Sequence, residues 1–280
     1  MRAIANAAPQ HDSGHPLDGW RLPHEPRYRP VAGEVAGFEA AAAARLPLLL
    51  TGPTGCGKTR FVEHMAWRLG RPLVTVACHE DLTAGDLVGR WLLDAEGTRW
   101  QDGPLALAAR HGAICYLDEL AEARSDAVVV LHPLADTRRV LPLERRSELL
   151  QAHPDFLLVA SYNPGYHGRH KALKPSTCQR FTAMAFDYPD AATEAAIVAE
   201  EGGIDADLAQ RLVALAQRTR RLREDGLEEG ASTRLLMHAA QLVRAGLAPR
   251  AACLQAVAAP LTSDPELAAA LRGLVHASFV

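Results

Sequence analysis

The residues best suited to chemistry form a glycine-rich stretch after a short apolar run. The stretch reads Gly52-Pro53-Thr54-Gly55-Cys56-Gly57-Lys58-Thr59. Because glycine has no Cβ, several backbone N–H groups can converge on one phosphate group. Lys58 is placed to reach the β- and γ-phosphates, and the hydroxyl of Thr59 is placed to bind Mg²⁺. The pattern predicts a site for ATP with Mg²⁺. The alternative is an ordinary glycine turn.

Two carboxylates follow a second apolar run, Ala113–Leu117. If this run is a buried parallel strand, Asp118 and Glu119 lie at the carboxyl edge of the sheet, where ligands of doubly wound folds bind. We expect Asp118 to hold Mg²⁺, through water, and Glu119 to polarise the attacking water as a general base. The alternative is that the pair caps the next helix.

Three further polar residues could complete such a site. Asn163 follows the apolar run Phe156–Ser161 and could hydrogen-bond the γ-phosphate or its water. As Pro164 comes next, Asn163 could equally be a turn residue. Arg180 precedes the last strand candidate, and Arg234 opens a helix behind a Ser/Thr cap. A guanidinium stabilises the charge that develops on the γ-phosphoryl group. The alternative, judged from their positions in the sequence alone, is that Arg180 and Arg234 are ordinary surface residues.

The elements that must position these residues follow from hydrophobic periodicity. Short apolar runs, typical of buried parallel strands, alternate with helical patterns, which indicates an α/β fold. The strand candidates are Leu46–Thr51, Pro72–Ala77, Ala113–Leu117, Phe156–Ser161 and Ala183–Phe186. We therefore predict a P-loop core with a parallel, five-stranded, doubly wound sheet.

Beyond Pro189 only helical patterns remain. They cover Ala191–Glu201, Asp207–Arg223, Thr233–Ala245, Pro249–Ala259 and Pro265–His276. Residues 1–30 show no periodicity and are rich in Pro, His, Gly and Arg. The predicted organisation is a flexible arm over 1–30, an α/β nucleotide-binding domain over 31–188, and a smaller all-helical domain over 189–280.

Composition narrows the class of protein. The net charge is −3, from 30 basic and 33 acidic residues, which disfavours nucleic acid as a partner. Five cysteines without a C-x-x-C pair fit a reducing cytoplasm rather than a disulfide framework. No signal peptide is visible, and no apolar run approaches the roughly 18 residues needed to span a bilayer. Cys56 is an oxidation-sensitive thiol or, more simply, a small filler residue.

Taken together, the motifs resemble those of the AAA+ ATPases, more narrowly the MoxR group and its CbbQ/NorQ/NirQ subfamily. The resemblance extends from about Tyr28 to Pro189 and continues more weakly through the helical part. It is carried by Cys78–Arg90, Trp100–Leu105, Tyr116–Glu119, Ser161–Tyr166 and Gln179–Phe181. Cys78–Leu82 is most like CbbQ. The chain departs from the usual pattern at Cys178 and over Tyr166–His170, which leaves the local substrate contacts open.

The resemblance implies a homo-oligomer, a hexameric ring with ATP between subunits. Asn163 then falls on the sensor 1 position, Arg180 on the arginine finger acting across the interface, and Arg234 on sensor 2. Residues 86–104 match the family's insert in its second helix, with a hairpin from Trp91 to Trp100. Residues 138–151 match a second hairpin, and both hairpins would face the pore or one rim.

The resemblance also implies a function and partners. The chain would be an ATP-hydrolysing motor that remodels and activates a metabolic enzyme complex, working with a CbbO-like protein that carries a von Willebrand factor A domain. The expected client is Rubisco. One alternative is NorQ/NirQ-like activation or maturation of nitric oxide or nitrite reductase. A second, of another class, is a nucleotide-switched scaffold without significant turnover. A third, a nucleic-acid motor, is disfavoured by the net charge.

Overall fold

The computed structural model of the protein describes residues 16–95, 97–164 and 172–279. These residues form two compact units, each described here by itself. The first unit contains the chain up to Thr51 and Lys58–Ala185, and the second contains Gly52–Gly57 together with the chain from Phe186 onward. The glycine-rich loop therefore belongs to the same compact unit as the helical part of the chain.

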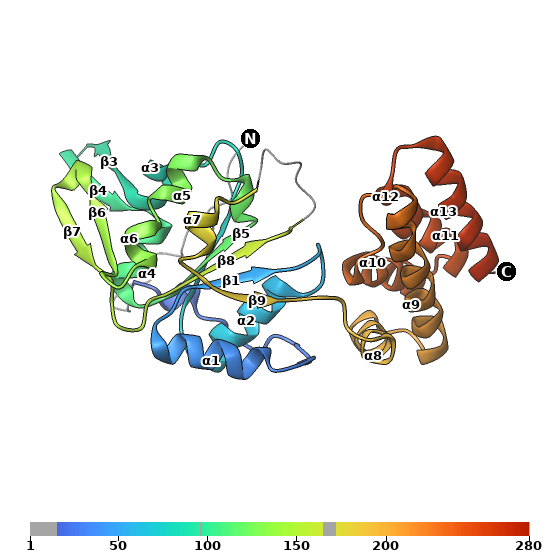
Figure 1. The fold of residues 1–280 in the computed structure, drawn as a ribbon. Coiled ribbons are helices and arrows are strands. Elements are labelled where there is room, and N and C mark those ends of the chain that lie inside the picture. Colours follow the sequence, from blue (N-terminus) through green and yellow to red (C-terminus); the bar gives the residue numbers. More distant parts are fainter. Residues whose placement is uncertain (1–15, 96, 165–171, 280) are drawn as a thin grey trace. The chain divides into compact units, whose positions relative to one another are not determined.

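The first unit is built on a five-stranded sheet (Figure 1). Its strands are β1 (Leu48–Thr51), β2 (Leu73–Ala77), β5 (Ile114–Asp118), β8 (Leu157–Tyr162) and β9 (Thr182–Ala185). Their order is β2-β5-β8-β1-β9, and all neighbours are parallel. The predicted fold class is confirmed, with each strand shifted by one or two residues. Parallel strands are covered on both faces, which is why they read as continuous apolar runs.

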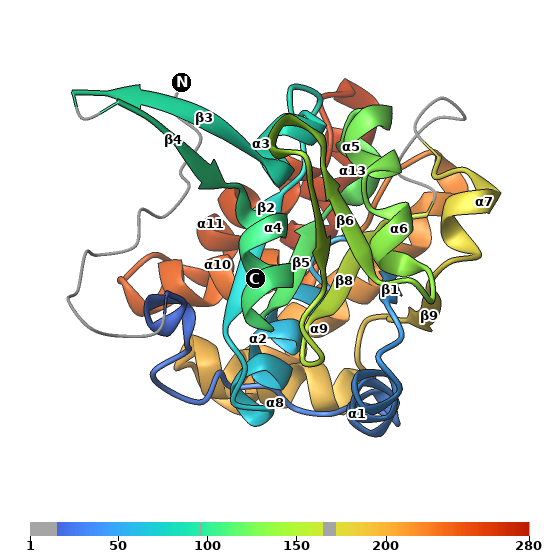
Figure 2. The ribbon, with the colours of Figure 1, turned by 90° about the vertical axis from the view of Figure 1, so that its left-hand side faces the viewer.

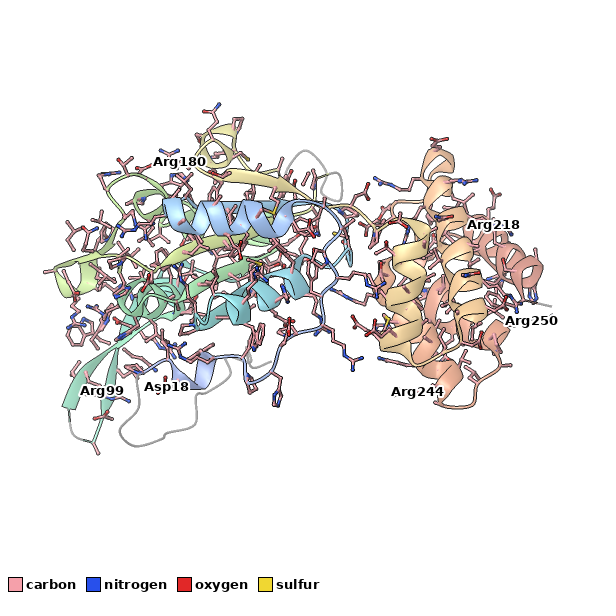
Figure 3. All side chains as sticks on the ribbon, turned by 90° about the horizontal axis from the view of Figure 1, so that it is seen from below. Asp18, Arg99, Arg180, Arg218, Arg244 and Arg250 are labelled. Atoms are coloured by element: carbon pink, nitrogen blue, oxygen red, sulfur yellow. The ribbon has the colours of Figure 1, made fainter. Side chains whose placement is uncertain are left out.

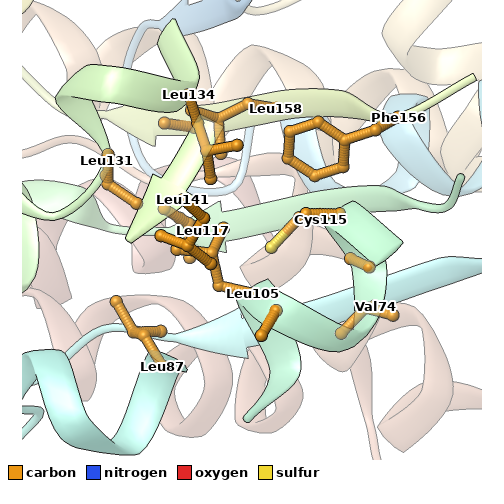
Figure 4. Packing of buried hydrophobic residues seen from close by; sticks show 14 of the residues in the cluster. Val74, Leu87, Leu105, Cys115, Leu117, Leu131, Leu134, Leu141, Phe156 and Leu158 are labelled. Atoms are coloured by element: carbon orange, nitrogen blue, oxygen red, sulfur yellow. The ribbon is translucent and has the colours of Figure 1, made fainter. Parts of the chain in front are cut away.

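Helices cover both faces of this sheet (Figure 1). One face carries α1 (Glu34–Ala44) and α2 (Lys58–Arg68). The other carries α4 (Pro104–His111) and the shorter α3 (Ala84–Val88), α5 (Ser125–Val129), α6 (His132–Ala135) and α7 (Pro175–Cys178). Figure 4 shows part of the core on this second face, where Leu117 and Leu158 of the sheet pack against Leu105 and Leu131. This packing fixes the strand ends that carry the polar residues.

The first unit also carries two antiparallel hairpins (Figure 2). The first consists of β3 (Gly89–Asp94) and β4 (Gly97–Asp102), and the second of β6 (Val140–Leu143) and β7 (Glu148–Gln151). Trp91 and Trp100 face each other across the first hairpin, with ring centroids 5.5 Å apart. The indole N–H of Trp91 donates to the carbonyl of Arg145 at 2.9 Å, which joins the two hairpins. Both hairpins fall within the residue ranges that the resemblance implied, 86–104 and 138–151.

Part of the segment that composition predicts to be a loose arm is packed. Leu17 is 0 % exposed and belongs to the core of the first unit, beside a short 3-10 helix, Asp18–Trp20. The ring of Tyr28 lies 5.2 Å from that of Phe61. Apolar contacts fix this stretch without any periodic pattern that a sequence could show. Residues 1–15 of the expected arm lie outside the described residues.

The second unit is helical. Its helices are α8 (Ala191–Gly202), α9 (Ala206–Arg221), α10 (Thr233–Arg244), α11 (Pro249–Cys253), α12 (Ala259–Leu261) and α13 (Pro265–Ser278). Side chains of Asp190, Asp205, Ser232 and Asp264 cap four of them, which explains where they begin. The helix predicted over 249–259 instead contains a π-helical segment, Leu254–Ala258, before Pro260. Proline lacks an N–H, so a regular helical hydrogen bond cannot form at Pro260.

Among the described residues, none of the helices has both the length and the apolar character that crossing a membrane requires.

Candidate nucleotide-binding site

The centre of the candidate site is Asp118, the last residue of β5. Its Oδ1 accepts hydrogen bonds from the hydroxyl of Tyr116, at 2.8 Å, and from that of Ser161, at 2.6 Å. Its Oδ2 lies 3.4 Å from the hydroxyl of Thr59, in the first turn of α2. Residues from β5, β8 and α2 therefore meet at one carboxylate. The sequence predicted the approach of Thr59 to Asp118 but missed Tyr116 and Ser161.

Glu119 is held in an uncommon backbone conformation. Its φ is +57°, in the left-handed region that non-glycine residues seldom adopt. The backbone N–H of Glu119 donates to the hydroxyl of Ser161 at 2.8 Å, and its side chain is exposed. Ser161 thus fixes both carboxylate residues, since it donates to one and accepts from the next. Such strain is typical of functional positions.

The glycine-rich loop turns through three glycines with positive φ: +152° at Gly52, +67° at Gly55 and +101° at Gly57. A Cβ on Gly52 would lie 2.3 Å from the carbonyl oxygen of Phe186, so this position requires glycine for space as well as for φ. After the loop, Lys58 begins α2 and is only 7 % exposed. The predicted strand–loop–helix context of the motif is observed.

The three remaining predicted residues lie on different elements. Asn163 directly follows β8 and is buried. Arg234 is the second residue of α10, and a Cβ on Gly55 would lie 3.3 Å from its own Cβ, so Arg234 begins beside the loop. Arg180, labelled in Figure 3, follows α7. Its Nε lies 3.2 Å from a carboxylate oxygen of Asp136, and its guanidinium donates to the carbonyl of Ser176. In this chain Arg180 is therefore held by Asp136.

Burial controls the protonation of two groups near Asp118. Burial and, secondarily, the charge of Asp118 raise the pKa of Tyr116. Burial, with further contributions from Asp118 and Glu119, raises the pKa of Cys78 to about 12. At neutral pH Tyr116 is a hydrogen-bond donor, and Cys78 is a neutral thiol rather than a nucleophile.

The residues at this cluster fit a magnesium ion. Mg²⁺ prefers oxygen ligands at about 2.1 Å in an octahedron, so adjacent ligand atoms lie about 3 Å apart. The Thr59 hydroxyl and the second carboxylate oxygen of Asp118 are 3.4 Å apart, come from two elements and are both hard oxygen donors. Small shifts would place both oxygen atoms around one ion. Alternatively, Asp118 would bind the ion through a water molecule.

A parallel α/β sheet, a glycine-rich loop opening a helix, and an acidic strand end define an ATPase domain of the P-loop class. Comparison with known proteins agrees. Residues 47–181 match the family model of the AAA domain (dynein-related subfamily), and residues 194–278 match that of the CbbQ/NirQ/NorQ C-terminal region. The chain belongs to the CbbQ/NirQ/NorQ family of AAA ATPases, whose domain implies ATP binding and hydrolysis.

Two curated relatives are similar over most of their length. The chain is 59 % identical to Protein CbbQ of Hydrogenophilus thermoluteolus, over 91 % of this chain and 96 % of the relative. It is also 59 % identical to Protein NorQ of Paracoccus denitrificans, over 91 % of this chain and 94 % of the relative. Among solved structures, a RuvB mutant of Thermotoga maritima matches with a TM-score of 0.52 at 14 % identity, covering 86 % of this chain and 68 % of that one, which shows a common fold.

Proposed function

We propose that this chain is the motor subunit of a ring that hydrolyses ATP in order to remodel and activate a metabolic enzyme complex. The observation that carries the proposal is the cluster at the end of β5. There Thr59 and Asp118 form a pair of oxygen donors, and Ser161 holds the exposed Glu119 directly beside them. This arrangement has the parts that phosphoryl transfer to water requires, namely a cation site and a positioned base.

The steps follow from the residues. The loop amides and Lys58 would bind the phosphates, while Thr59 and Asp118 would hold Mg²⁺, which neutralises charge on the phosphate oxygens when bound. Glu119 would orient and polarise the attacking water. Its exposed side chain and fixed backbone suit that role, because only the side chain must adjust to the water.

Three residues would complete the reaction. We propose that Asn163 contacts the γ-phosphate or its water as sensor 1, and that Arg234 acts as sensor 2 beside the loop. We propose Arg180 as the arginine finger of the neighbouring subunit in a homohexamer. Its ion pair with Asp136 supports this role, because a guanidinium already fixed in orientation loses less conformational freedom when it meets a phosphate.

The proposed client is Rubisco, and the proposed partner is a CbbO-like protein with a von Willebrand factor A domain. The Cys78–Leu82 stretch favours this assignment. The alternative is NorQ/NirQ-like work on nitric oxide or nitrite reductase, which the equal identity to NorQ keeps open. All five cysteines lie in the described part of the chain and none of them is in a disulfide, which supports a cytoplasmic location.

The two hairpins are the proposed substrate-facing elements. Both carry apolar side chains exposed to solvent, among them Leu93 at 83 %, Leu149 at 65 % and Trp91 at 49 %. Exposed apolar groups of this size favour contact with another protein.

The decisive experiment is Glu119→Gln in the full chain, with Glu80→Gln as control because Glu80 is also an exposed glutamate in the first unit. We expect Glu119→Gln to bind a fluorescent ATP analogue as the wild type does, but to release no phosphate above background. The control should do both normally. Turnover like that of the wild type in Glu119→Gln would remove Glu119 from its role.

The same assay separates the other readings. A wild-type chain that binds ATP but releases no phosphate, even with the partner present, would be a nucleotide-switched scaffold. Mixing Arg180→Ala with Lys58→Ala subunits should restore part of the activity if Arg180 acts across an interface. Partner capture from cells, followed by identification of the bound client, would distinguish a carboxylase from a reductase.

A further inference from the structure

Thr54, in the glycine-rich loop, has both of its backbone polar groups held by side chains from the helical part of the second unit. Its N–H donates to a carboxylate oxygen of Glu229 at 2.9 Å. Its carbonyl accepts from the hydroxyl of Tyr188, also at 2.9 Å. Thr54, Tyr188 and Glu229 all belong to the same compact unit. One non-glycine residue of the loop is therefore clamped from two sides.

The ring of Tyr188 is itself fixed. The guanidinium carbon of Arg220 lies 3.7 Å from the centroid of the ring, a close cation–π contact. Arg220 forms two hydrogen bonds with Glu194, at 2.8 Å and 2.6 Å, and its Nε donates to the carbonyl of Ala231 at 2.9 Å. Because all three contacts constrain the guanidinium plane, the stacked ring has little freedom to move.

The same network reaches the helix that carries Arg234. Glu194 is 0 % exposed and also accepts from the hydroxyl of Thr233, the first residue of α10, at 2.6 Å. Ser232 caps this helix and lies close to the loop. A Cβ added to Gly55 would be only 2.7 Å from the Cβ of Ser232. Contacts thus run without a gap from Thr54 to the start of α10.

A buried ion pair such as Glu194–Arg220 is a poor way to gain stability, because desolvation offsets most of the attraction. What it does supply is fixed geometry at the ring of Tyr188. The loop it supports needs such geometry, since three of its residues are glycines with positive φ and an unsupported glycine-rich segment samples many conformations.

We propose that Tyr188 and Glu229 are positioning residues for nucleotide binding, holding the loop in its phosphate-binding conformation before the nucleotide arrives. This inference rests on the proposed function, because the loop must bind phosphates for the clamp to matter. A preformed loop needs no further ordering when the ligand binds, so the benefit appears as affinity. Neither Tyr188 nor Glu229 is among the residues proposed to act in the chemical step, so that step should be nearly unaffected.

The test uses two single substitutions in the full chain. Tyr188→Phe keeps the ring under Arg220 and removes only the hydroxyl, and Glu229→Ala removes the carboxylate. The matched controls are Glu228→Ala, at the exposed neighbour of Glu229, and Tyr28→Phe, which removes a tyrosine hydroxyl bonded to Glu34 in the first unit. From the net value of one hydrogen bond, we expect Kd and KM for ATP to rise about threefold to tenfold in each test variant, with kcat within about twofold of the wild type.

Hydrogen exchange without nucleotide gives an independent readout. Amides of residues 52–57 should exchange faster in Tyr188→Phe and Glu229→Ala than in the wild type and both controls. Glu229→Gln retains an acceptor oxygen and should recover most of the lost affinity, which a purely structural defect would not do.

The outcomes separate the inference from the function on which it rests. If the wild-type chain does not bind ATP, the proposed function fails. If the wild type binds ATP while both test variants match the controls in affinity and in exchange, the positioning role is refuted. If Tyr188→Phe does not fold, Glu229→Ala alone tests the positioning role. Because Glu229 is only partly buried, its replacement should leave the fold intact.

Discussion

Ser161→Ala probes how the acidic strand end is held together. Ser161 is 0 % exposed, donates to Asp118 at 2.6 Å and accepts from the N–H of Glu119 at 2.8 Å. Alanine is smaller than serine and introduces no clash, so the change removes the polar contacts of the Ser161 hydroxyl and little else. The expected effects are therefore electrostatic and conformational rather than steric.

The magnitude follows from the two lost partners. Leaving the partly buried N–H of Glu119 without its partner costs about 1–3 kcal/mol. A hydrogen bond to a charged carboxylate is worth about 1.5–3 kcal/mol. Asp118 retains the hydrogen bond from Tyr116, so we expect a total of about 2–4 kcal/mol. For a unit of this size, each kcal/mol lowers the melting temperature by about 2–4 °C.

Activity should fall further than stability alone predicts. Glu119 has φ +57°, and its anchored N–H is one of the contacts that keep it there. A left-handed conformation costs about 1–2 kcal/mol for a non-glycine residue. Without the hydrogen bond to Ser161, we therefore expect the backbone of Glu119 to shift towards a more favourable conformation. A displaced base lowers kcat, and a shift of about 1 Å can cost on the order of 10²-fold.

Differential scanning fluorimetry and a phosphate-release assay, both well below the melting temperature, would measure the two effects. Ser125→Ala, at an exposed serine in the first unit, is the control. We expect Ser161→Ala to bind ATP within a few-fold of the wild type. A variant with unchanged melting temperature and unchanged kcat would refute the reasoning that Ser161 organises this strand end.

Three further predictions follow. Glu194→Ala leaves the guanidinium of Arg220, whose side chain is only 16 % exposed, without its carboxylate partner. We expect thermal or chemical unfolding to show a destabilisation of about 3–5 kcal/mol. An unchanged unfolding transition would contradict this pairing. Gly52→Ala places a Cβ 2.3 Å from the carbonyl oxygen of Phe186 and should abolish ATP binding in a titration. Retained affinity would show that the loop backbone can shift to accommodate the methyl group. The pKa of Cys78, raised from 9.0 to about 12 by burial and by neighbouring carboxylates, means that the native state resists losing the thiol proton. Its contribution to stability is full below about pH 9 and falls as the pH rises from 9 towards 12, so iodoacetamide at pH 9 should label Cys78 only in denaturant.

Several features were predictable because they depend on local sequence alone. Each strand of the sheet is an apolar run, and a buried parallel strand requires that composition whatever its neighbours are. The loop from Gly52 to Thr59 needs glycines at fixed positions, and Asp118 follows its strand directly. Parallel topology then brings the carboxyl ends of β1, β5 and β8 to one edge, so Thr59 and Asp118 could be expected to meet.

Other features of the structure could not be predicted from the sequence pattern. Tyr116 lies in an apolar strand and looks like a core residue, while its hydroxyl in fact reaches Asp118. Leu17 has no periodic neighbours, yet it is buried. A polar residue in an otherwise apolar strand, as at Ser161, was the one available hint. The pairing of Arg180 with Asp136 joins residues 44 positions apart and follows no spacing rule.

The sequence by itself determined the P-loop class, the five parallel strands and the order of polar residues at their ends, because these depend on hydrophobic periodicity and on fixed spacing along the chain. Only the tertiary structure decided which side chains hold that site in place. Tyr188 and Glu229 lie 134 and 175 residues from Thr54, and the ring of Tyr188 is fixed by Arg220. Contacts between segments so distant in the chain arise from packing, which no local pattern records.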